Sequence, residues 1–187
     1  MPFKVSAVSG APNLESLPVA KIIDYPLEQA DYKPFAQARL CVTADALMVQ
    51  LWAFEVNPSP KSSLKAVFYH PGDITRWFSV QLWSSGELEG LCADKESTRS
   101  FTPALQPLWG EDLQGVYWGG SFTWPRGDLT ELWGEDFFTP GHLIPGNLYK
   151  LSDDGVKPHS GSLFPADFAG GQPFAAASMG EFEIVSY

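Results

Sequence analysis

The sequence predicts an all-β protein: a single domain built as an antiparallel, jelly-roll-like β-sandwich. Runs in which apolar and polar residues alternate recur along the chain, and each is bounded by Gly, Pro, Asn, Asp or Ser. Helical periodicity is nearly absent, and no internal repeat or linker divides the 187 residues. Eight or nine short strands separated by turns therefore predict one sandwich that covers residues 1–187, with its core from about residue 20.

Alternation defines the strands. It is clearest in residues 76–83, where Phe78, Val80 and Leu82 share one face and Trp77, Ser79, Gln81 and Trp83 share the other. The other predicted strands cover residues 21–25, 36–43, 47–56, 64–69, 87–92, 115–124, 148–151 and 180–185. The short turns within these runs predict two hairpins, 36–56 and 76–92.

The remaining segments predict little regular structure. Residues 27–34 are polar and predict a loop or one helical turn, and residues 94–112 are polar, contain proline and predict a long surface loop. Residues 129–133 predict a helical turn with Asp128 as its N-cap. Residues 160–178 form a loose stretch rich in Gly, Ala and Pro.

Composition excludes several classes of function. The formal net charge of -10 and the pI of about 4.6 argue against nucleic acid, which is bound through clustered Lys and Arg. No apolar run reaches the roughly 18 residues that a membrane span needs. The first residues do not read as a signal peptide, so we expect a cytoplasmic protein with no membrane partner. Nothing in the sequence indicates the oligomeric state.

Cysteine and histidine show no metal-ligand spacing. Cys41 and Cys92 both fall in strand-like runs and predict two buried thiols rather than a disulfide. The three histidines, His70, His142 and His159, are scattered, and His159 predicts a loop histidine bonded to backbone.

Aromatic residues make up 14% of the chain and include seven tryptophans, more than a core of this size requires. Trp52, Trp118 and Trp124 have apolar neighbours on their faces, which favours the core. Sugar recognition uses flat apolar surfaces together with planar polar groups. The candidate carbohydrate contacts are therefore the polar and aromatic positions of three strands, which would form one patch if those strands are neighbours: Trp77, Gln81, Trp83, Gln37, Arg39 and Tyr117. The alternative for Trp77 and Trp83 is a second buried face beneath residues 94–112.

Four stretches, in this order, resemble the family-9 carbohydrate-binding module and its relatives in the DOMON-like superfamily. They are YKPFAQARLCVTADALMVQLW within residues 31–52, FSVQLWSSGEL overlapping residues 77–86, WGGSFTWP at residues 118–125, and GNLYKLSDDGVKPHSGSLFP followed by MGEFEIV from Met179. The resemblance covers most of the chain from about Asp31 and implies a sandwich fold, a mono- or oligosaccharide ligand and, in some members, structural calcium. The sequence departs from the family's usual residues at Ser121, Leu163 and Met179, and no Asp precedes residue 64.

Three hypotheses follow. The first is a non-catalytic carbohydrate-binding sandwich. The second is a structural or interaction protein that has lost the sugar site, which the departures at Ser121 and Leu163 favour. The third is a haem-binding relative, which would need Met48 or Met179 together with a histidine as axial ligands.

We expect neither a cofactor nor catalysis. Asp153 and Asp154 predict a solvated Asp-Gly turn, although they are also the residues best placed to bind calcium. The pairs Glu111/Asp112 and Glu135/Asp136 are adjacent in sequence and so cannot flank a glycosidic bond from two sides.

Overall fold

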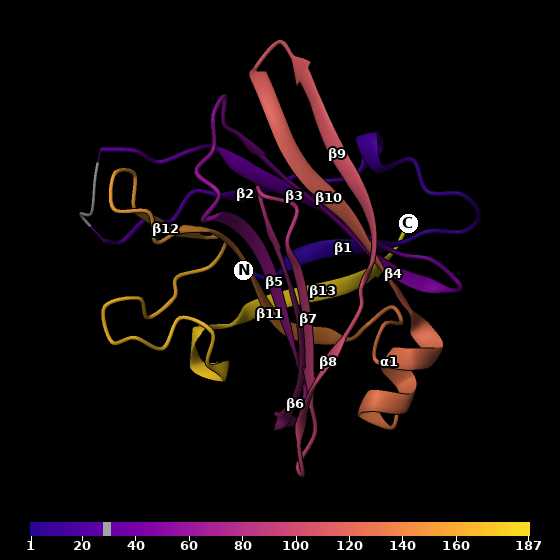
Figure 1. Cartoon of the computed structure of the whole chain (residues 1–187). Coiled ribbons are helices and arrows are strands. Elements are labelled where there is room, and N and C mark those ends of the chain that lie inside the picture. Colours follow the sequence, from indigo (N-terminus) through magenta and orange to yellow (C-terminus); the bar gives the residue numbers. More distant parts are fainter. Residues whose placement is uncertain (28–30) are drawn as a thin grey trace.

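The computed structural model describes residues 1–27 and 31–187 and, within them, contains 13 β-strands in one curled sheet (Figure 1). The elements are β1 (Phe3–Ala7), β2 (Ala20–Ile22), β3 (Ala36–Val42), β4 (Ala46–Phe54), β5 (Ser62–His70), β6 (Asp73–Trp83), β7 (Leu88–Ala93), β8 (Thr98–Phe101), β9 (Ala104–Asp112), β10 (Gly115–Pro125), α1 (Arg126–Trp133), β11 (Leu143–Ser152), β12 (His159–Ser162) and β13 (Gly180–Ser186), with short 3-10 helices at Leu14–Ser16 and Ala176–Ser178.

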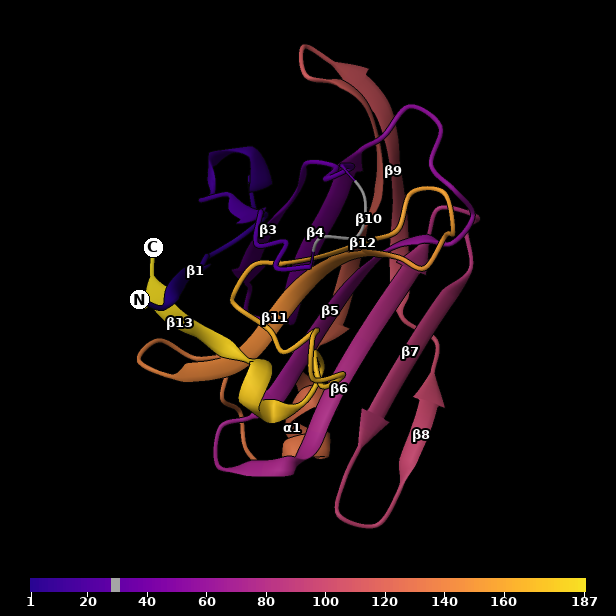
Figure 2. The same ribbon diagram turned by 90° about the vertical axis from the view of Figure 1, so that its left-hand side faces the viewer.

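The sheet folds over on itself to form two layers. Its strand order is β8-β7-β6-β5-β11-β13-β1-β3-β4-β10-β9, with β12 beside β11 and β2 beside β3. One layer is centred on β11, β5, β6 and β7, which lie side by side in Figure 2, and the other on β3, β4 and β10. Aromatic rings meet between the layers: the centroids of Phe78 on β6 and Trp124 on β10 lie 5.2 Å apart. The predicted all-β sandwich is confirmed.

The N-terminal strand makes the sheet mixed. β1 pairs in parallel with both β13 and β3, whereas the other strand pairs are antiparallel. Val5 of β1 is 1% exposed and belongs to the main core, so the predicted start of the core at about residue 20 leaves out this strand. Its sequence FKVSA does alternate apolar and polar residues, but over only five positions, and the prediction left it out.

The predicted surface loop at residues 94–112 is wrong, because this segment forms β8 and β9. Both are edge strands: β8 pairs with β7 alone, and β9 pairs with β10 alone. An edge strand exposes most of its residues and tolerates proline, here Pro107, so its sequence resembles that of a loop. The β9–β10 hairpin extends past the other strands (Figure 1).

Other predicted bounds need smaller corrections. The predicted turn at residues 129–133 is the second half of α1, whose N-cap is Pro125, so Asp128 lies in the first turn instead of capping it. The predicted strand 148–151 begins earlier, at Leu143, and the predicted strand 21–25 is limited to β2. The predicted loop at 27–34 lies partly outside the described residues. None of the helices in the described part of the chain is long and apolar enough to cross a membrane.

Residues 160–178 are largely irregular, as predicted, but they do not form a loose surface segment. After β12 it runs across the outer face of β5 and β11 (Figure 2). There Phe168, Ala176 and their neighbours cover Val67, Tyr69 and Tyr149. The part of the layer that carries these three side chains is therefore buried on both faces.

The close approach of β10 to β4 requires glycine at position 119. A Cβ there would overlap the carbonyl oxygen of Leu51 and lie 2.7 Å from the Cα of Trp52. We expect Gly119→Ala to lower the free energy of unfolding by about 3 kcal/mol or more, because the colliding atoms belong to the backbone of a central strand. Gly127→Ala, in α1, is the matched control because its Cβ would meet open space. Urea unfolding that leaves both variants equally stable would contradict the expected clash.

Candidate functional site

The structure divides the six predicted contact residues between two faces. Gln81, Trp83 and Trp77 lie on the outer face of β6, whereas Gln37 and Arg39 lie on β3 and Tyr117 lies on β10. Four strands separate β6 from β3 in the sheet, and the two layers turn their outer faces in opposite directions. The six residues therefore do not form one patch, since the strands assumed to be neighbours belong to different layers.

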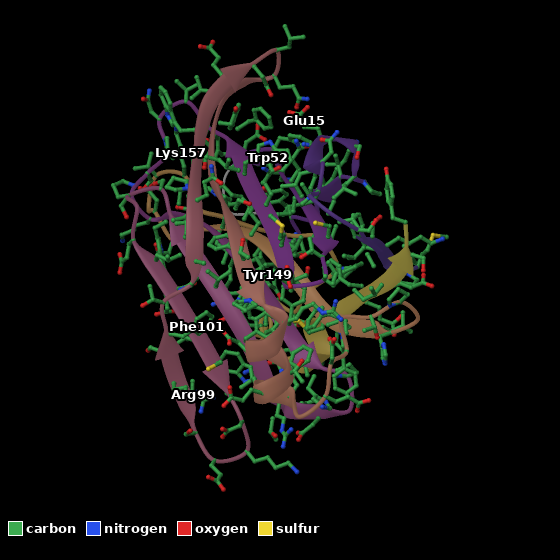
Figure 3. The ribbon with its side chains drawn as sticks, turned by 90° about the vertical axis from the view of Figure 1, so that its right-hand side faces the viewer. Glu15, Trp52, Arg99, Phe101, Tyr149 and Lys157 are labelled. Carbon is green, nitrogen blue, oxygen red and sulfur yellow. The ribbon has the colours of Figure 1, made fainter. Side chains whose placement is uncertain are left out.

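Gln37, Arg39 and Tyr117 pack against residues of their own face. The guanidinium of Arg39 lies 5.2 Å from the ring centroid of Trp52, which is on the β4 ribbon in Figure 3. Tyr117 meets Phe54 edge to face, with centroids 5.9 Å apart, and Gln37 is 8% exposed. These three side chains thus belong to the packing of the other face, and as carbohydrate contacts they stay a prediction.

Gln81 and Trp83 line a groove of about 330 Å³ on the outer face of the first layer. Trp77 is not among its lining residues, because it lies six residues before Trp83, about 20 Å along the strand, beside Tyr69. The groove is lined by Lys61, Ser63, Gln81, Trp83, Leu151, Ser152, Asp153, His159, Ser160 and Phe174. The pairing of β5 with β6 and with β11 brings the side chains of three strands to one place.

Hydrogen bonds fix the amide of Gln81 in the groove. Its Nε2 donates to the hydroxyl of Ser63 at 2.9 Å, and its Oε1 accepts from the ammonium of Lys65 at 3.2 Å. Both partners come from β5, where Ser63 pairs with Trp83 and Lys65 pairs with Gln81. A planar polar group is therefore held in one orientation beside an indole ring.

Two buried tyrosines hold the backbone that carries Phe174. Tyr149 OH donates to the carbonyl oxygen of Pro173 at 2.6 Å, and Tyr69 OH donates to the carbonyl oxygen of Phe174 at 2.9 Å. Burial raises the pKa of both phenols above the ordinary value, so both remain donors at neutral pH. The sequence did not identify Phe174, because its position depends on the path of an irregular segment.

A buried ionic network closes the neighbouring end of the sandwich. Lys150 is completely buried, and its Nζ lies 3.0 Å from Oε1 of Glu55 and 2.5 Å from the hydroxyl of Ser62. The same carboxylate oxygen accepts from Ser62 at 2.7 Å and from the indole of Trp118 at 3.1 Å. This network was not predicted from the sequence, although a charged residue two positions from Leu148, on the same strand face, was a usable signal.

The charges within the network are set by burial and by neighbours. Burial lowers the pKa of Lys150 to about 8, although the attraction of Glu55 opposes this shift. Burial alone would raise the pKa of Glu55, but the charge of Lys150 and the hydrogen bonds from Ser62, Lys150 and Tyr32 together lower it. At neutral pH the two residues therefore form an ion pair.

His159 is the residue that joins this network to the groove. Burial and the charge of Lys150 lower the pKa of His159 to about 4, so its ring is neutral at pH 7. Its Nε2 lies 2.6 Å from Nζ of Lys150, and its Nδ1 lies 2.8 Å from the carbonyl oxygen of Lys157. The neutral ring thus donates from Nδ1 and accepts at Nε2. The predicted bond from this histidine to backbone is present, but the ring is buried at the start of β12 instead of lying in a loop.

No metal-binding cluster is present among residues 1–27 and 31–187: no three residues of His, Cys, Asp or Glu come together there. The Oδ1 of Asp154 accepts from the backbone N–H of Val156 at 2.6 Å and of Lys157 at 3.0 Å, as in an Asx-turn. Cys41 and Cys92 are buried free thiols, as predicted. Each histidine ring packs against an aromatic ring, His70 and His142 against Phe137.

The ion pair gives a direct stability prediction. Lys150→Met removes the cation and leaves a carboxylate buried, so we expect the free energy of unfolding to fall by about 3–5 kcal/mol. The double variant Lys150→Met/Glu55→Gln should recover part of this loss. Lys4→Met, at an exposed lysine of β1, is the control. Chemical denaturation that gives Lys150→Met the stability of the native protein would contradict the role of the pair.

Acid should destabilise the fold through His159. Between pH 6.5 and about 4 the unfolded chain binds a proton at this ring that the folded chain excludes. The free energy of unfolding therefore falls as the pH is lowered through this window, by about 2–3 kcal/mol from this residue. Glu55, whose folded pKa is lowered, acts in the same direction below its ordinary pKa of 4.5.

Denaturation curves over this pH range measure the effect. The pH dependence of stability should be shallower in His159→Gln than in the native protein. His142→Gln changes a histidine outside the network and should keep the native slope. An unchanged slope in His159→Gln would show that protons are taken up elsewhere.

Comparison with known proteins reveals likeness at the level of fold. No family model matches the sequence, and no curated protein matches it. Solved structures with the same architecture include a protein of Bacteroides uniformis assigned to carbohydrate binding, with a TM-score of 0.74, 15% sequence identity and coverage of 98% of both chains.

The family-9 carbohydrate-binding module of Caldicellulosiruptor kristjanssonii is a second such structure. Its complex with glucose has a TM-score of 0.62 and 10% identity over 100% of this chain and 97% of the module. Its complex with cellotriose has a TM-score of 0.59 and 11% identity over 98% and 94% of the two chains. The resemblance to the family-9 sandwich predicted from the sequence is thus confirmed as a likeness of fold that spans the whole chain.

Proposed function

We propose that this protein binds a carbohydrate, without transforming it, in the groove between Trp83 and Phe174. The observation that carries the proposal is that Gln81, an amide fixed by Ser63 and Lys65, lines the same groove as these two aromatic residues. Aromatic faces suit the C–H surface of a pyranose ring, and a fixed planar amide suits its paired hydroxyl groups. Ser63 and Ser160 add hydroxyl groups to the same lining.

The size and the fold support the same ligand class. A volume of about 330 Å³ lies at the lower end of small-molecule sites and suits a monosaccharide or a disaccharide. The solved structures that share the fold carry names that assign them to carbohydrate binding, and one of them holds glucose or cellotriose. Because fold alone does not establish function, the groove must be tested directly.

A binding role without catalysis fits the charges around the groove. Glycoside hydrolysis uses two carboxyl groups on opposite sides of the scissile bond. Asp153 is the one carboxylate among the described lining residues, and Glu55 is held in the buried ion pair. The groove thus offers contacts for a sugar but no second acid for its cleavage.

The alternative is an interaction protein that keeps the sandwich but binds no sugar. It is favoured by the β9–β10 hairpin, where Trp109 is 82% exposed and Leu113 is fully exposed. Large apolar side chains on a projecting hairpin are typical of surfaces that contact other macromolecules. The same sugar titrations distinguish the two hypotheses, since the alternative predicts no response to any glycan.

Removal of the indole at position 83 tests the groove. Trp83→Ala should weaken the binding of the best oligosaccharide in a panel by about tenfold or more, equivalent to about 1.4 kcal/mol, because one of the two aromatic contacts is lost. Titration calorimetry, or tryptophan fluorescence where the signal permits, gives the dissociation constant. Melting temperatures without sugar check that the variant remains folded.

Trp77→Ala is the matched control, because Trp77 belongs to the same strand and the same face but lies outside the groove. It should bind sugar as the native protein does. Equal losses in both variants would place the ligand along the whole face of β6. Native protein that responds to no sugar would refute the proposed function.

A further inference from the structure

Lys65 is a buried cation that lacks a carboxylate partner among the described residues. Its side chain is on the outer face of β5, and the residue is 8% exposed. The ammonium makes one hydrogen bond, 3.2 Å to Oε1 of Gln81, and lies 4.5 Å from the ring centroid of Phe174. The ion pairs of the described residues involve other groups.

These contacts use only part of the hydrogen-bonding capacity of the Lys65 ammonium. An ammonium carries three donors, and a buried charge is stable only when it is paired and hydrogen-bonded. A neutral amide and a ring face supply part of this requirement. Burial lowers the pKa of Lys65, and the attraction of Glu89 only partly opposes the shift. An anion near this ammonium would therefore gain binding free energy from the attraction between the charges, which a neutral molecule would not.

Lys65 lies next to the groove, so an anion bound there would be attracted by its charge. Lys65 is not itself among the lining residues, but Gln81 and Phe174, its two contacts, both line the groove, so the ammonium lies directly behind the groove wall. Phe174 is 36% exposed and belongs to an irregular segment. Lys61 adds a second cation to the lining.

Acidic groups also lie near the groove, one on β7 and one just after β11. Glu89 is exposed on β7 and pairs with Gln81 on the side away from β5. Asp153 follows β11 four residues after Tyr149, the partner of Lys65 in the sheet, which puts it about 13 Å further along the strand. Lys61 lies at the Asp153 end, because Ser62 pairs with Ser152, so Asp153 has a cation of its own and Lys65 is the cation nearest the Phe174 end.

We propose that the ligand of this groove is a sugar that carries an anionic group, such as a uronic acid, and that Lys65 is its counter-ion. The inference rests on the proposed function and specifies the class of sugar. The carboxylate occupies the Phe174 end, where the charge of Lys65 attracts it from behind Gln81 and Phe174, while the neutral hydroxyl groups reach Gln81 and the Asp153 end.

Parallel titrations of the native protein with glucose, glucuronate and glucose 6-sulfate at one ionic strength test the proposal. Backbone amide chemical shifts detect even weak binding and locate it. We expect at least one anionic sugar to bind about tenfold more tightly than glucose, the difference that about 1.4 kcal/mol produces. Comparing the carboxylate with the sulfate shows which anion the site accepts.

Three variants assign the preference to Lys65. Lys65→Met keeps the apolar stem and should reduce the affinity for the anionic sugar to that for glucose, whereas Lys65→Arg keeps the charge and should retain the preference. Lys4→Met is the control for a general loss of positive charge. A preference that persists in Lys65→Met would overturn the assignment.

Titrations of the native protein alone distinguish sugar binding from the preference for an anionic sugar, even if Lys65→Met fails to fold. Equal affinities for glucose and both anionic sugars would overturn the anionic class and leave sugar binding intact. Shifts in the groove with the anionic sugars and none with glucose would support both. The absence of shifts with all three would overturn both.

Discussion

The ion pair between Lys150 and Glu55 is the interaction on which this end of the molecule depends. Glu55 follows β4 and accepts from Trp118 of β10, so it belongs to one layer of the sandwich. Lys150 on β11, Ser62 on β5 and His159 on β12 belong to the other. Five strands from both layers are thereby joined at one charge pair where the hydrophobic core ends.

A buried pair of this kind is better explained by specificity than by stability. The desolvation of two charges offsets much of their attraction, so an apolar pair of similar volume could be equally stable. What the charges add is a condition on register, because a shift of β11 by one residue would bury Leu151 or Tyr149 in place of Lys150 and leave Glu55 unpaired. Ser62, Trp118 and His159 complete the hydrogen bonding, so in the native register neither Lys150 nor Glu55 is left unsatisfied.

The register that the ion pair fixes also determines the shape of the groove. Successive residues of a strand point to opposite faces, and three residues of the network have a groove residue directly after them in sequence. Ser62 precedes Ser63, Lys150 precedes Leu151, and His159 precedes Ser160. A register fixed by charges on the inner face therefore places the lining of the groove on the outer face, without any direct contact between Lys150 and a ligand.

The sequence predicted what depends on local pattern and missed what depends on the path of the sheet. Strands with one buried face, such as residues 76–83, alternate clearly and were predicted with the correct inward residues Phe78, Val80 and Leu82. Edge strands β8 and β9 were taken for a loop, because exposure on both faces removes the alternation. Gln81 and Trp83 were found from one strand alone, but the separation of β3 from β6 is a long-range property that no local pattern encodes.

Lys65 and Lys150 show how one protein treats buried lysines in two ways. Both lie on neighbouring strands, both are largely buried, and burial lowers the pKa of both. Lys150 has a carboxylate, a hydroxyl group and an imidazole around its ammonium, which leaves no donor for anything else. Lys65 has a single amide oxygen and a ring face, and both belong to residues that line the groove. If burial of a lysine were merely tolerated here, the partially satisfied one would have no reason to lie beside the groove. Its position beside the groove is the reason why we propose an anionic ligand for it.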